Sequence, residues 1–491
     1  MTRTLRKGRR LRFKKQTLVR NAPFVESARS GMRFFTIVFA ILRLLTYRLI
    51  HRRRKNFDEQ FAREIRETLE SLGPVYIKLG QILSMRPDYI SDVYCHEFES
   101  LLDAGKPIPR SKMRTYLKCI SHSGQKEIVA QLDHPVAVAS LSEVYKVTSA
   151  SGTTLAVKVL RPGVREMVRQ DFSILKKLIK LIGHRFGRTD RAHWVDLVCE
   201  IEKWLLEETN YFYEMRNIEA MRRDLVSFDN IIIPRAYPEL SSKNIFVMDW
   251  INGYSMLELI RMKRKGELPE FPFSLEEKLE ELIHDVAIKS LLRGYFHADL
   301  NPANIIITND GKIALIDFGL IKFFSKEARR GTILFLLGIT SNSPELIFKS
   351  AELFAKNGSS YNREEVYEDL SKLLYDYSGM PAKDVSSTRV ILDILKLSLN
   401  QGFEYPWSLI LYTRSAVNLD GQVLRLHPDF SFSDYGSSRL LEVYTQAFID
   451  EHLSVSHLVD VSEDVVAVLK DLPKNVGTIL HTMVTKNKTT N

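Results

Sequence analysis

The chain has 491 residues, of which 45% are hydrophobic and 26% are charged. At about 150 residues per domain, this length predicts roughly three domains, or one large two-lobed fold with extensions. The composition excludes wholesale disorder, a collagen-like repeat and a small disulfide-stapled scaffold. Cys95, Cys119 and Cys199 form no C-x-x-C pair, so the sequence predicts neither a zinc site nor a redox dithiol.

Charge is distributed unevenly along the chain. Residues 1–55 contain 17 Lys and Arg residues and one acidic residue, Glu26, which gives a net charge of +16. The remaining 436 residues contain 53 basic and 59 acidic residues, a net charge of −6. The sequence therefore predicts a strongly basic head attached to a mildly acidic body, and each part needs its own explanation.

The second half of the basic head has the pattern of an amphipathic helix. Its longest uncharged run, residues 34–42, has nine residues, whereas a membrane-spanning helix needs about 20, so we do not expect it to span. We expect the helix either to lie on an anionic membrane surface or to pack its apolar face on the protein's own body. No zinc finger or RNP motif supports nucleic-acid binding. A narrow stripe of polar or small residues consists of Arg29, Arg33, Thr36, Ala40, Arg43 and Tyr47, and the broad apolar face includes Phe35, Ile37, Val38, Ile41, Leu42, Leu45 and Leu49.

Further elements follow in an order that suggests two lobes. Periodicity predicts helices over residues 57–72, 76–85, 112–120, 164–183 and 194–225, and strands over 142–148, 154–160, 230–236, 244–250, 304–308 and 312–317. After residue 319 almost everything is helix-like. A strand-rich lobe followed by a helical lobe with an embedded hairpin is the layout of an α+β, protein-kinase-like fold. We predict a basic segment over 1–55, a helical extension over 56–130, an N-lobe over 131–252, a helical C-lobe over 253–440 and a helical tail over 441–491.

Three short motifs in the right order predict an ATP–Mg²⁺ site. Lys158, in the strand sequence Leu-Ala-Val-Lys, can reach the α- and β-phosphates of ATP as a point charge. Asp299 and Asn304 have the Asp-x4-Asn spacing of a catalytic loop, in which the Asp orients the nucleophile and the Asn holds Mg²⁺. Asp317, in an Asp-Phe-Gly sequence, supplies a second metal-binding carboxylate.

A carboxylate is also expected to pair with Lys158. Treating 194–225 as one helix, we favour Glu214 and keep Glu208 in reserve, because the two point in different directions.

Two features of ordinary protein kinases are missing from the sequence. The stretch before Lys158 has no G-x-G-x-x-G, and no A-P-E follows Asp317. Since alanine carries a Cβ, an alanine-rich loop cannot approach phosphates as freely as a glycine-rich one. The residues predicted to contact the nucleotide are Ala137, Val138, Ala139 and Ser140 in this loop, together with Met248 in the strand 244–250.

With these motifs the chain resembles the ABC1/ADCK/UbiB family of atypical kinases over about residues 57–325. The stretch 73–88 is similar to the K-x-G-Q signature of that family, with Lys78, Gly80 and Gln81 at the matching positions, and 296–304 resembles its H-A-D catalytic loop. The E-x-D motif would fall on residues 208–210, where the third position is Asn210, and the usual H-P-G-N is Asn-Pro-Ala-Asn over residues 301–304. The C-terminal hydrophobic hairpin of many bacterial relatives is not found, because 465–476 is short and interrupted by charge and proline.

The resemblance implies an ATP-binding and ATP-hydrolysing protein that supports ubiquinone or related prenyl-lipid biosynthesis at a membrane. It also implies that Lys78 and Gln81 act at the catalytic site, on an extension that folds over it, so we expect phosphorylation of other proteins to be weak. We expect peripheral membrane association, on the cytoplasmic side or in a mitochondrion or plastid, and enzymes of quinone biosynthesis as partners. The alternatives are a small-molecule kinase and a nucleotide-sensing scaffold without turnover. The oligomeric state is left open.

Overall fold

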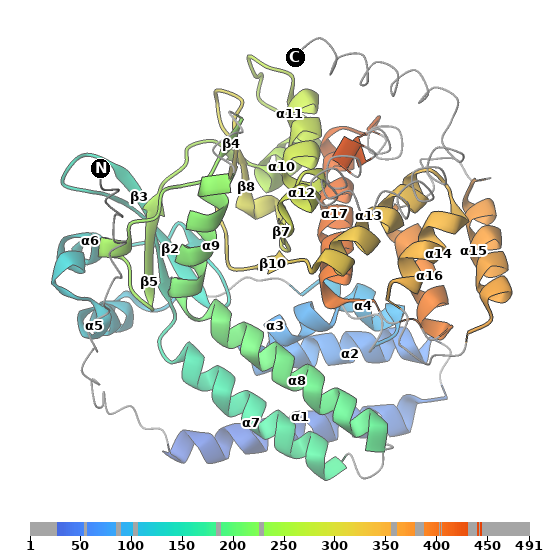
Figure 1. Cartoon of the computed structure of the whole chain (residues 1–491). Coiled ribbons are helices and arrows are strands. Elements are labelled where there is room, and N and C mark those ends of the chain that lie inside the picture. The colour runs from blue at the N-terminus through green and yellow to red at the C-terminus, as the bar shows by residue number, and fades with distance from the viewer. Residues whose placement is uncertain are drawn as a thin grey trace, which may run out of the picture.

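A computed structural model of the chain describes residues 27–53, 56–84, 90–101, 107–182, 188–224, 230–354, 361–378, 387–401, 403, 405–430, 439–440 and 442–443. Residues 1–26 of the basic head, nearly all of the predicted tail, and the stretch 465–476 lie outside these ranges. A helical extension, a lobe built on a sheet and a larger helical lobe follow one another along the chain (Figure 1).

The extension begins with two helices separated by one glycine. Helix α2 (Phe57–Leu72) has the bounds that the sequence predicts. It ends at Gly73, whose φ of 97° is in the region that favours glycine, and Pro74 then opens helix α3 (Pro74–Leu83). The remaining helices of the extension are α4 (Asp92–Glu99), α5 (Arg110–Ile120) and α6 (Lys126–Ala130).

The small lobe is built on an antiparallel sheet with the strand order β1-β2-β3-β5. Its hairpin, β2 (Ser142–Thr148) and β3 (Thr154–Leu160), matches the predicted strands residue for residue, and β1 (Ala137–Val138) and β5 (Ile245–Asp249) complete the sheet. Apolar side chains of α5 and α6 share one hydrophobic cluster with side chains of β2, β3 and β5. The extension therefore covers one face of this sheet, and α9 lies near it in Figure 1.

The predicted helix over 194–225 is two helices, and that prediction was wrong. After α7 (Val164–Ile182) comes helix α8 (Arg188–Glu208), and two residues separate it from α9 (Tyr211–Asp224). At the break, the Asn210 side-chain oxygen accepts a hydrogen bond from the Phe212 N–H at 3.4 Å. A short polar side chain that binds nearby backbone in this way favours a helix start over a helix interior.

A second sheet carries the catalytic-loop region, with the order β4-β9-β8-β6. The predicted hairpin is β8 (Ile305–Ile307) and β9 (Ile313–Leu315); β4 (Ile231–Ile232) lies parallel to β9, and β6 (Tyr254–Ser255) pairs with β8. The strand predicted over 230–236 is thus shorter and belongs to this sheet. Strands β7 (Tyr295–His297) and β10 (Ile321–Phe323) form a separate antiparallel pair, and neither strand was predicted.

The large lobe is mainly helical. Helix α11 (Leu275–Leu282) continues into a π-helical turn over Ile283–Ile288. The largest fully buried cluster runs through both lobes, and a second one joins α13 to α17. The other helices are α10 (Met256–Lys265), α12 (Ser290–Arg293), α13 (Lys326–Thr340), α14 (Pro344–Glu352), α15 (Arg363–Ser378), α16 (Ser387–Asn400) and α17 (Trp407–Leu426).

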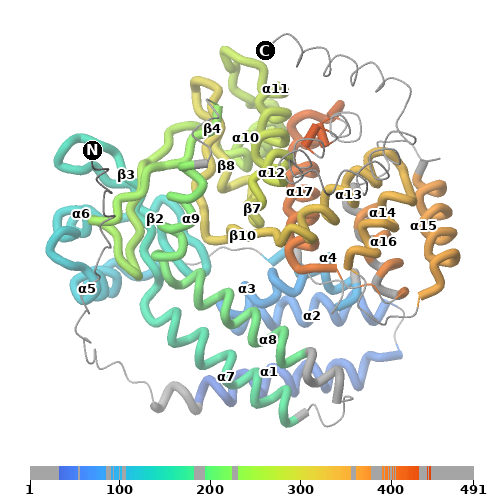
Figure 2. The backbone as a smooth tube through the Cα atoms, viewed as in Figure 1, coloured from blue at the N-terminus to red at the C-terminus, as the bar shows by residue number. Residues whose placement is uncertain are grey.

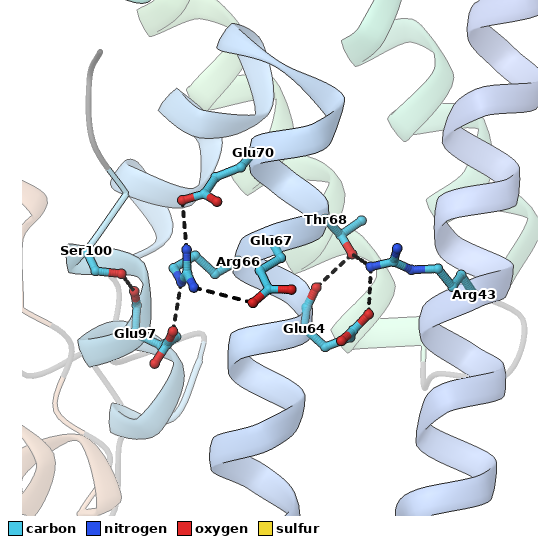
Figure 3. A network of polar contacts seen from close by, with 8 residues as sticks. All are labelled: Arg43, Glu64, Arg66, Glu67, Thr68, Glu70, Glu97 and Ser100. Carbon is cyan, nitrogen blue, oxygen red and sulfur yellow. Dashed lines mark hydrogen bonds and ion pairs between the residues drawn. The ribbon is translucent and has the colours of Figure 1, made fainter.

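Helix α1 (Ser27–His51) lies along one edge of the molecule, beside α2 and α7 (Figure 1 and Figure 2). Its polar contacts with the body come from the predicted polar stripe, and Ile37 adds an apolar one. Arg33 pairs with Asp171 of α7 at 2.6 Å, and Arg43 pairs with Glu64 of α2 at 2.6 Å (Figure 3). The predicted apolar face is divided. Ile37 is fully buried in the core and Ile41 packs against that core, so the expectation that the face packs on the body is confirmed for this part, whereas Phe35, Leu42, Leu45 and Leu49 are exposed.

The expectation that this helix does not span a membrane was based on the length of its uncharged run. Residues Met32–His51 are long and apolar enough to cross a membrane, by length and composition only. The uncharged run of nine residues ends at Arg43, whose charge is paired with Glu64 in this structure.

Candidate active site

Three charged side chains from separate elements meet between the lobes. Lys158 lies in the middle of β3, between Val144 of β2 and Phe246 of β5, in a strand whose central residues are all buried. Its Nζ donates to Glu214 Oε1 of α9 at 2.6 Å and lies 3.5 Å from Asp317 Oδ2. The ion pair that we favoured between Lys158 and Glu214 is therefore present.

The two carboxylates of this cluster are not equivalent. The Glu214 side chain is 8% exposed, and burial raises its pKa, although Lys158 opposes this. The Asp317 side chain is 40% exposed. Desolvation by the surrounding protein favours the neutral form of Asp317. The Lys158 charge and a hydrogen bond from the Gly319 N–H outweigh it and hold the pKa of Asp317 below its usual value. Asp317 is thus the ionised, accessible carboxylate, and Glu214 holds the lysine.

Lys158 remains charged in this setting. Burial by itself would lower the pKa of Lys158, but the two carboxylates outweigh it, and the pKa lies above the ordinary lysine value. A permanently charged ammonium inside the protein is suited to binding an anion such as a phosphate.

The loop after β7 is fixed by hydrogen bonds of His297. The Asp299 N–H donates to His297 Nδ1 at 3.2 Å, so the proton of the neutral ring is on Nε2, which contacts the Asp317 carbonyl oxygen at 2.5 Å. Further along, the Ile316 N–H donates to the Asn304 carbonyl oxygen at 3.1 Å. This places the Asn304 backbone beside the residue that precedes Asp317.

Asp299 lies two residues after β7, and its side chain is solvent-exposed. Desolvation by the surrounding protein raises the pKa of Asp299; the charge of Lys78 opposes this, and the charge of Asp317 adds to it. A carboxylate whose pKa is raised accepts a proton more readily, which suits a group that orients or deprotonates a nucleophile.

Helix α3 brings Lys78 close to Asp299 and Asp317. Lys78 Nζ lies 3.2 Å from Glu208 Oε1 at the end of α8, and its charge lowers the pKa values of both Asp299 and Asp317. Glu208, our reserve partner for Lys158, thus pairs with the lysine of the extension instead.

The other two residues of this motif face the extension. A Cβ at Gly80 would overlap the Leu101 side chain and would lie 2.8 Å from Leu69 Cδ1, so a larger residue here requires these two leucines to shift. Gln81 Nε2 donates to the Leu101 carbonyl oxygen at 3.0 Å. The structure therefore ties Gln81 to the backbone after α4 and does not show it in contact with Asp299 or Asp317, contrary to the role at the catalytic site that the resemblance implied.

The predicted nucleotide loop forms the edge of the small-lobe sheet. Ala137 and Val138 pair with Val144 and Glu143, and the Ala139 N–H donates to the Ser142 carbonyl oxygen at 2.9 Å. Ala137 is exposed, Val138 and Ala139 are half-buried, and Ser140 is buried. Met248 is buried on β5 opposite Ala156, shortly before the chain crosses to the large lobe.

The part of the chain that carries most of these residues matches the model of one protein family. The model of the ABC1 atypical kinase-like domain matches residues 100–351, slightly more than half of the chain. The chain belongs to the ABC1 atypical kinase-like family. Its fold is accordingly the α+β, kinase-like fold that the sequence predicts.

Several curated proteins are similar to this ABC1-family chain. An uncharacterized Synechocystis protein is 25% identical over 445 residues, which cover 90% of this chain and 62% of that protein. The probable protein kinase UbiB of Marinobacter nauticus is 26% identical over 373 residues (74% and 66%). The chloroplastic Arabidopsis thaliana protein named Activity of BC1 complex kinase 3 is 26% identical over 385 residues (77% and 52%). The chain thus spans about half to two thirds of the length of these relatives.

Among solved structures, that of the Mycobacterium tuberculosis protein Rv3197 in complex with erythromycin is similar. The sequences are 21% identical, the match covers 71% of this chain and 87% of that chain, and the TM-score is 0.47.

Two residues of this ABC1-family chain take roles that the sequence did not reveal. Asn210, at the third position of the E-x-D motif, supports the start of α9 and hence the position of Glu214. Arg414 of α17 donates from both terminal nitrogens to Ser84 Oγ at 3.3–3.4 Å, and its charge favours ionised Asp299 by lowering the pKa of that group. Arg414 is remote in sequence from every motif, so no pattern could have identified it.

Proposed function

We propose that this chain binds ATP with Mg²⁺ and transfers or hydrolyses the terminal phosphate, in support of ubiquinone or related prenyl-lipid biosynthesis at a membrane. The observation that carries the nucleotide part is the buried Lys158–Glu214 pair beside the accessible, ionised Asp317. The resemblance of the signature motifs, with a relative named as a probable protein kinase UbiB, supports the prenyl-lipid part.

The residues present fit a magnesium nucleotide. Among the described residues, no group of three or more His, Cys, Asp or Glu side chains gathers as a metal centre. Mg²⁺ in nucleotide sites needs only one or two protein ligands, because phosphate and water oxygens complete its shell. Asp317 and Asn304 would hold the ion. Bound Mg²⁺ would neutralise charge on the β- and γ-phosphates.

The remaining polar groups have distinct tasks in this proposal. Lys158, held by Glu214, binds phosphate oxygens of the nucleotide. Asp299 orients the attacking hydroxyl or water and takes its proton, for which its raised pKa is suited. Lys78 adds a second positive charge beside Asp299 and Asp317.

The extension favours ATP hydrolysis or a small acceptor over a protein acceptor. The Lys78–Glu208 ion pair joins α3 to the end of α8 next to the catalytic carboxylates. Because a peptide acceptor would have to approach Asp299 past α3, we propose that phosphorylation of other proteins by this chain is weak.

The test compares three variants of the full-length protein. We expect Lys158→Ala and Asp317→Asn to abolish the thermal stabilisation by ATP with Mg²⁺ and to lower ATP turnover by about a hundredfold or more. Asp310→Asn is the matched control, because Asp310 lies in the turn between β8 and β9 and contacts Thr308 rather than the cleft. Unchanged Mg²⁺–nucleotide binding in Asp317→Asn would refute the assignment of the site.

A further inference from the structure

One side of α1 is a continuous apolar surface that no described part of the chain covers. Phe35 and Phe39 are each 70% exposed, and Ile50 is 74% exposed. On a helix with 100° per residue, the exposed apolar residues fall within one half of the circumference. We call this surface the outer face of α1; it consists of Met32, Phe35, Phe39, Leu42, Leu45, Leu49 and Ile50.

The opposite side of α1 is bound to the body along most of the helix. Near its start, Arg33 donates to both carboxylate oxygens of Asp171, at 2.8 and 2.6 Å, and to the Leu72 carbonyl oxygen at 2.8 Å. Near its end, the Tyr47 ring stacks on Phe61 of α2 with ring centroids 6.2 Å apart.

Between these two points lies the contact of Arg43 with α2. Its Nη2 donates to Glu64 Oε1 at 2.6 Å and to Thr68 Oγ1 at 3.2 Å (Figure 3). Contacts spread in this way fix the rotation of the helix about its axis. The outer face is therefore held outward by specific polar contacts on the other side.

The charge around the outer face is positive. The helix contains no acidic residue over its 25 positions. While Arg33 and Arg43 are paired with the body, Arg48, Arg52 and Arg53 are exposed at the C-terminal end. Apolar side chains flanked by exposed arginines are complementary to a bilayer with anionic headgroups.

From these observations we infer that the outer face of α1 inserts into the interface of an anionic membrane and that α1 lies parallel to the bilayer plane. This rests on the proposed function only for the presence of a membrane, and not on catalysis. The parallel orientation follows from the contacts of α1 with the body. A spanning α1 would have to leave the body, and the fully buried carboxylate of Asp171 would then lose its partner Arg33. Asp171 and the Phe61 ring thus exclude the crossing that length and composition alone would allow.

The experiment is co-flotation of the full-length protein with vesicles in the absence of nucleotide. The vesicles are phosphatidylcholine mixed with phosphatidylglycerol, or phosphatidylcholine alone. We expect Phe35→Ser with Phe39→Ser to lower binding to the anionic vesicles by at least about tenfold, because each ring loses its apolar transfer into lipid. The double variant Leu42→Ser with Leu49→Ser should lower binding to the anionic vesicles to a similar extent. Tyr375→Ser is the matched control, since Tyr375 is a 77% exposed aromatic residue on α15 and should leave binding unchanged.

Three results would overturn the inference. Equal flotation of the wild type and both double variants would show that other basic residues bind the lipid without α1 insertion. Self-association of the wild type that the double variants lose, without flotation of either, would show that a second copy covers the outer face. Resistance of the membrane-bound protein to alkaline extraction would show a spanning helix. Because ATP turnover is measured separately, loss of the proposed catalytic function would leave these results unaffected.

Discussion

The contact between Arg33 and Asp171 predicts how strongly α1 is attached to the body. Asp171 is fully buried, and the Arg33 side chain is 24% exposed. Replacing Arg33 by Ala removes both hydrogen bonds to the carboxylate and leaves a buried negative charge without its partner. Breaking one side of a buried ion pair costs about 3–5 kcal/mol. Since Arg33 is partly open to water, which can enter the space that it leaves, we take the lower end, about 3 kcal/mol.

This cost should appear as local opening of α1. Among the described side chains of α1, only Ile37 is fully buried, so detaching the helix exposes far less apolar surface than unfolding the body. At about 1.4 kcal/mol per tenfold change in an equilibrium constant, Arg33→Ala should lower the protection of α1 amides from hydrogen exchange by about a hundredfold. Amides of β2 and β3 should keep their protection.

Two further variants make this measurement specific. Arg43→Ala removes an ion pair on the same helix whose side chains are 49% and 24% exposed, and an exposed pair contributes about 1 kcal/mol or less. Arg33→Ala combined with Asp171→Ala removes the stranded charge and should recover about 1–3 kcal/mol of the loss. If α1 protection in Arg33→Ala equals that in Arg43→Ala, the reasoning about the buried carboxylate is refuted.

Two other substitutions test the links between the extension and the site. Gly80→Ala should destabilise the protein by about 1–3 kcal/mol in denaturant unfolding, because the new Cβ overlaps Leu101 and forces α3 to shift; an unchanged midpoint would show that Leu101 moves aside freely. Arg414→Gln removes a charge that lowers the pKa of Asp299, so this pKa should rise and the acidic limb of the ATP turnover profile should move to higher pH. A uniform loss of turnover with no shift of that limb would contradict a role of Arg414 through Asp299.

Local sequence signals predicted the elements whose bounds are set by nearby residues. The hairpin over 142–148 and 154–160 is correct because alternating β-branched residues flank a Ser-Gly turn, and α2 is correct because Gly73 and Pro74 end it. The three-residue strand β10 was missed because its only partner, β7, lies far earlier in the chain. Periodicity also could not locate the break at Asn210, where side-chain hydrogen bonding interrupts an otherwise helical pattern.

The site was predictable where one residue type in one motif determines the chemistry. Lys158, Asp299 and Asp317 follow from spacing, and the structure brings Lys158 and Asp317 to 3.5 Å. Glu214 was favoured on the assumption of one continuous helix over 194–225. The structure has two helices there, yet Glu214 does pair with Lys158. Helical periodicity divided α1 into two faces only approximately, because Ile37 of the predicted apolar face is buried and Thr36 of the predicted stripe is exposed. It could not say which side meets the body, since Asp171 lies on another helix.

The contacts of α17 have a consequence for the synthesis of this protein. Ser415 Oγ donates to the His297 carbonyl oxygen at 2.8 Å, and Arg414 contacts Ser84 at the end of α3. The loop after β7 and the extension therefore both contact a helix that is synthesised after them. A growing chain can fold its sheet lobe early, but its active site reaches its final form only when α17 docks. An incomplete chain without α17 would therefore present the candidate site without these two contacts.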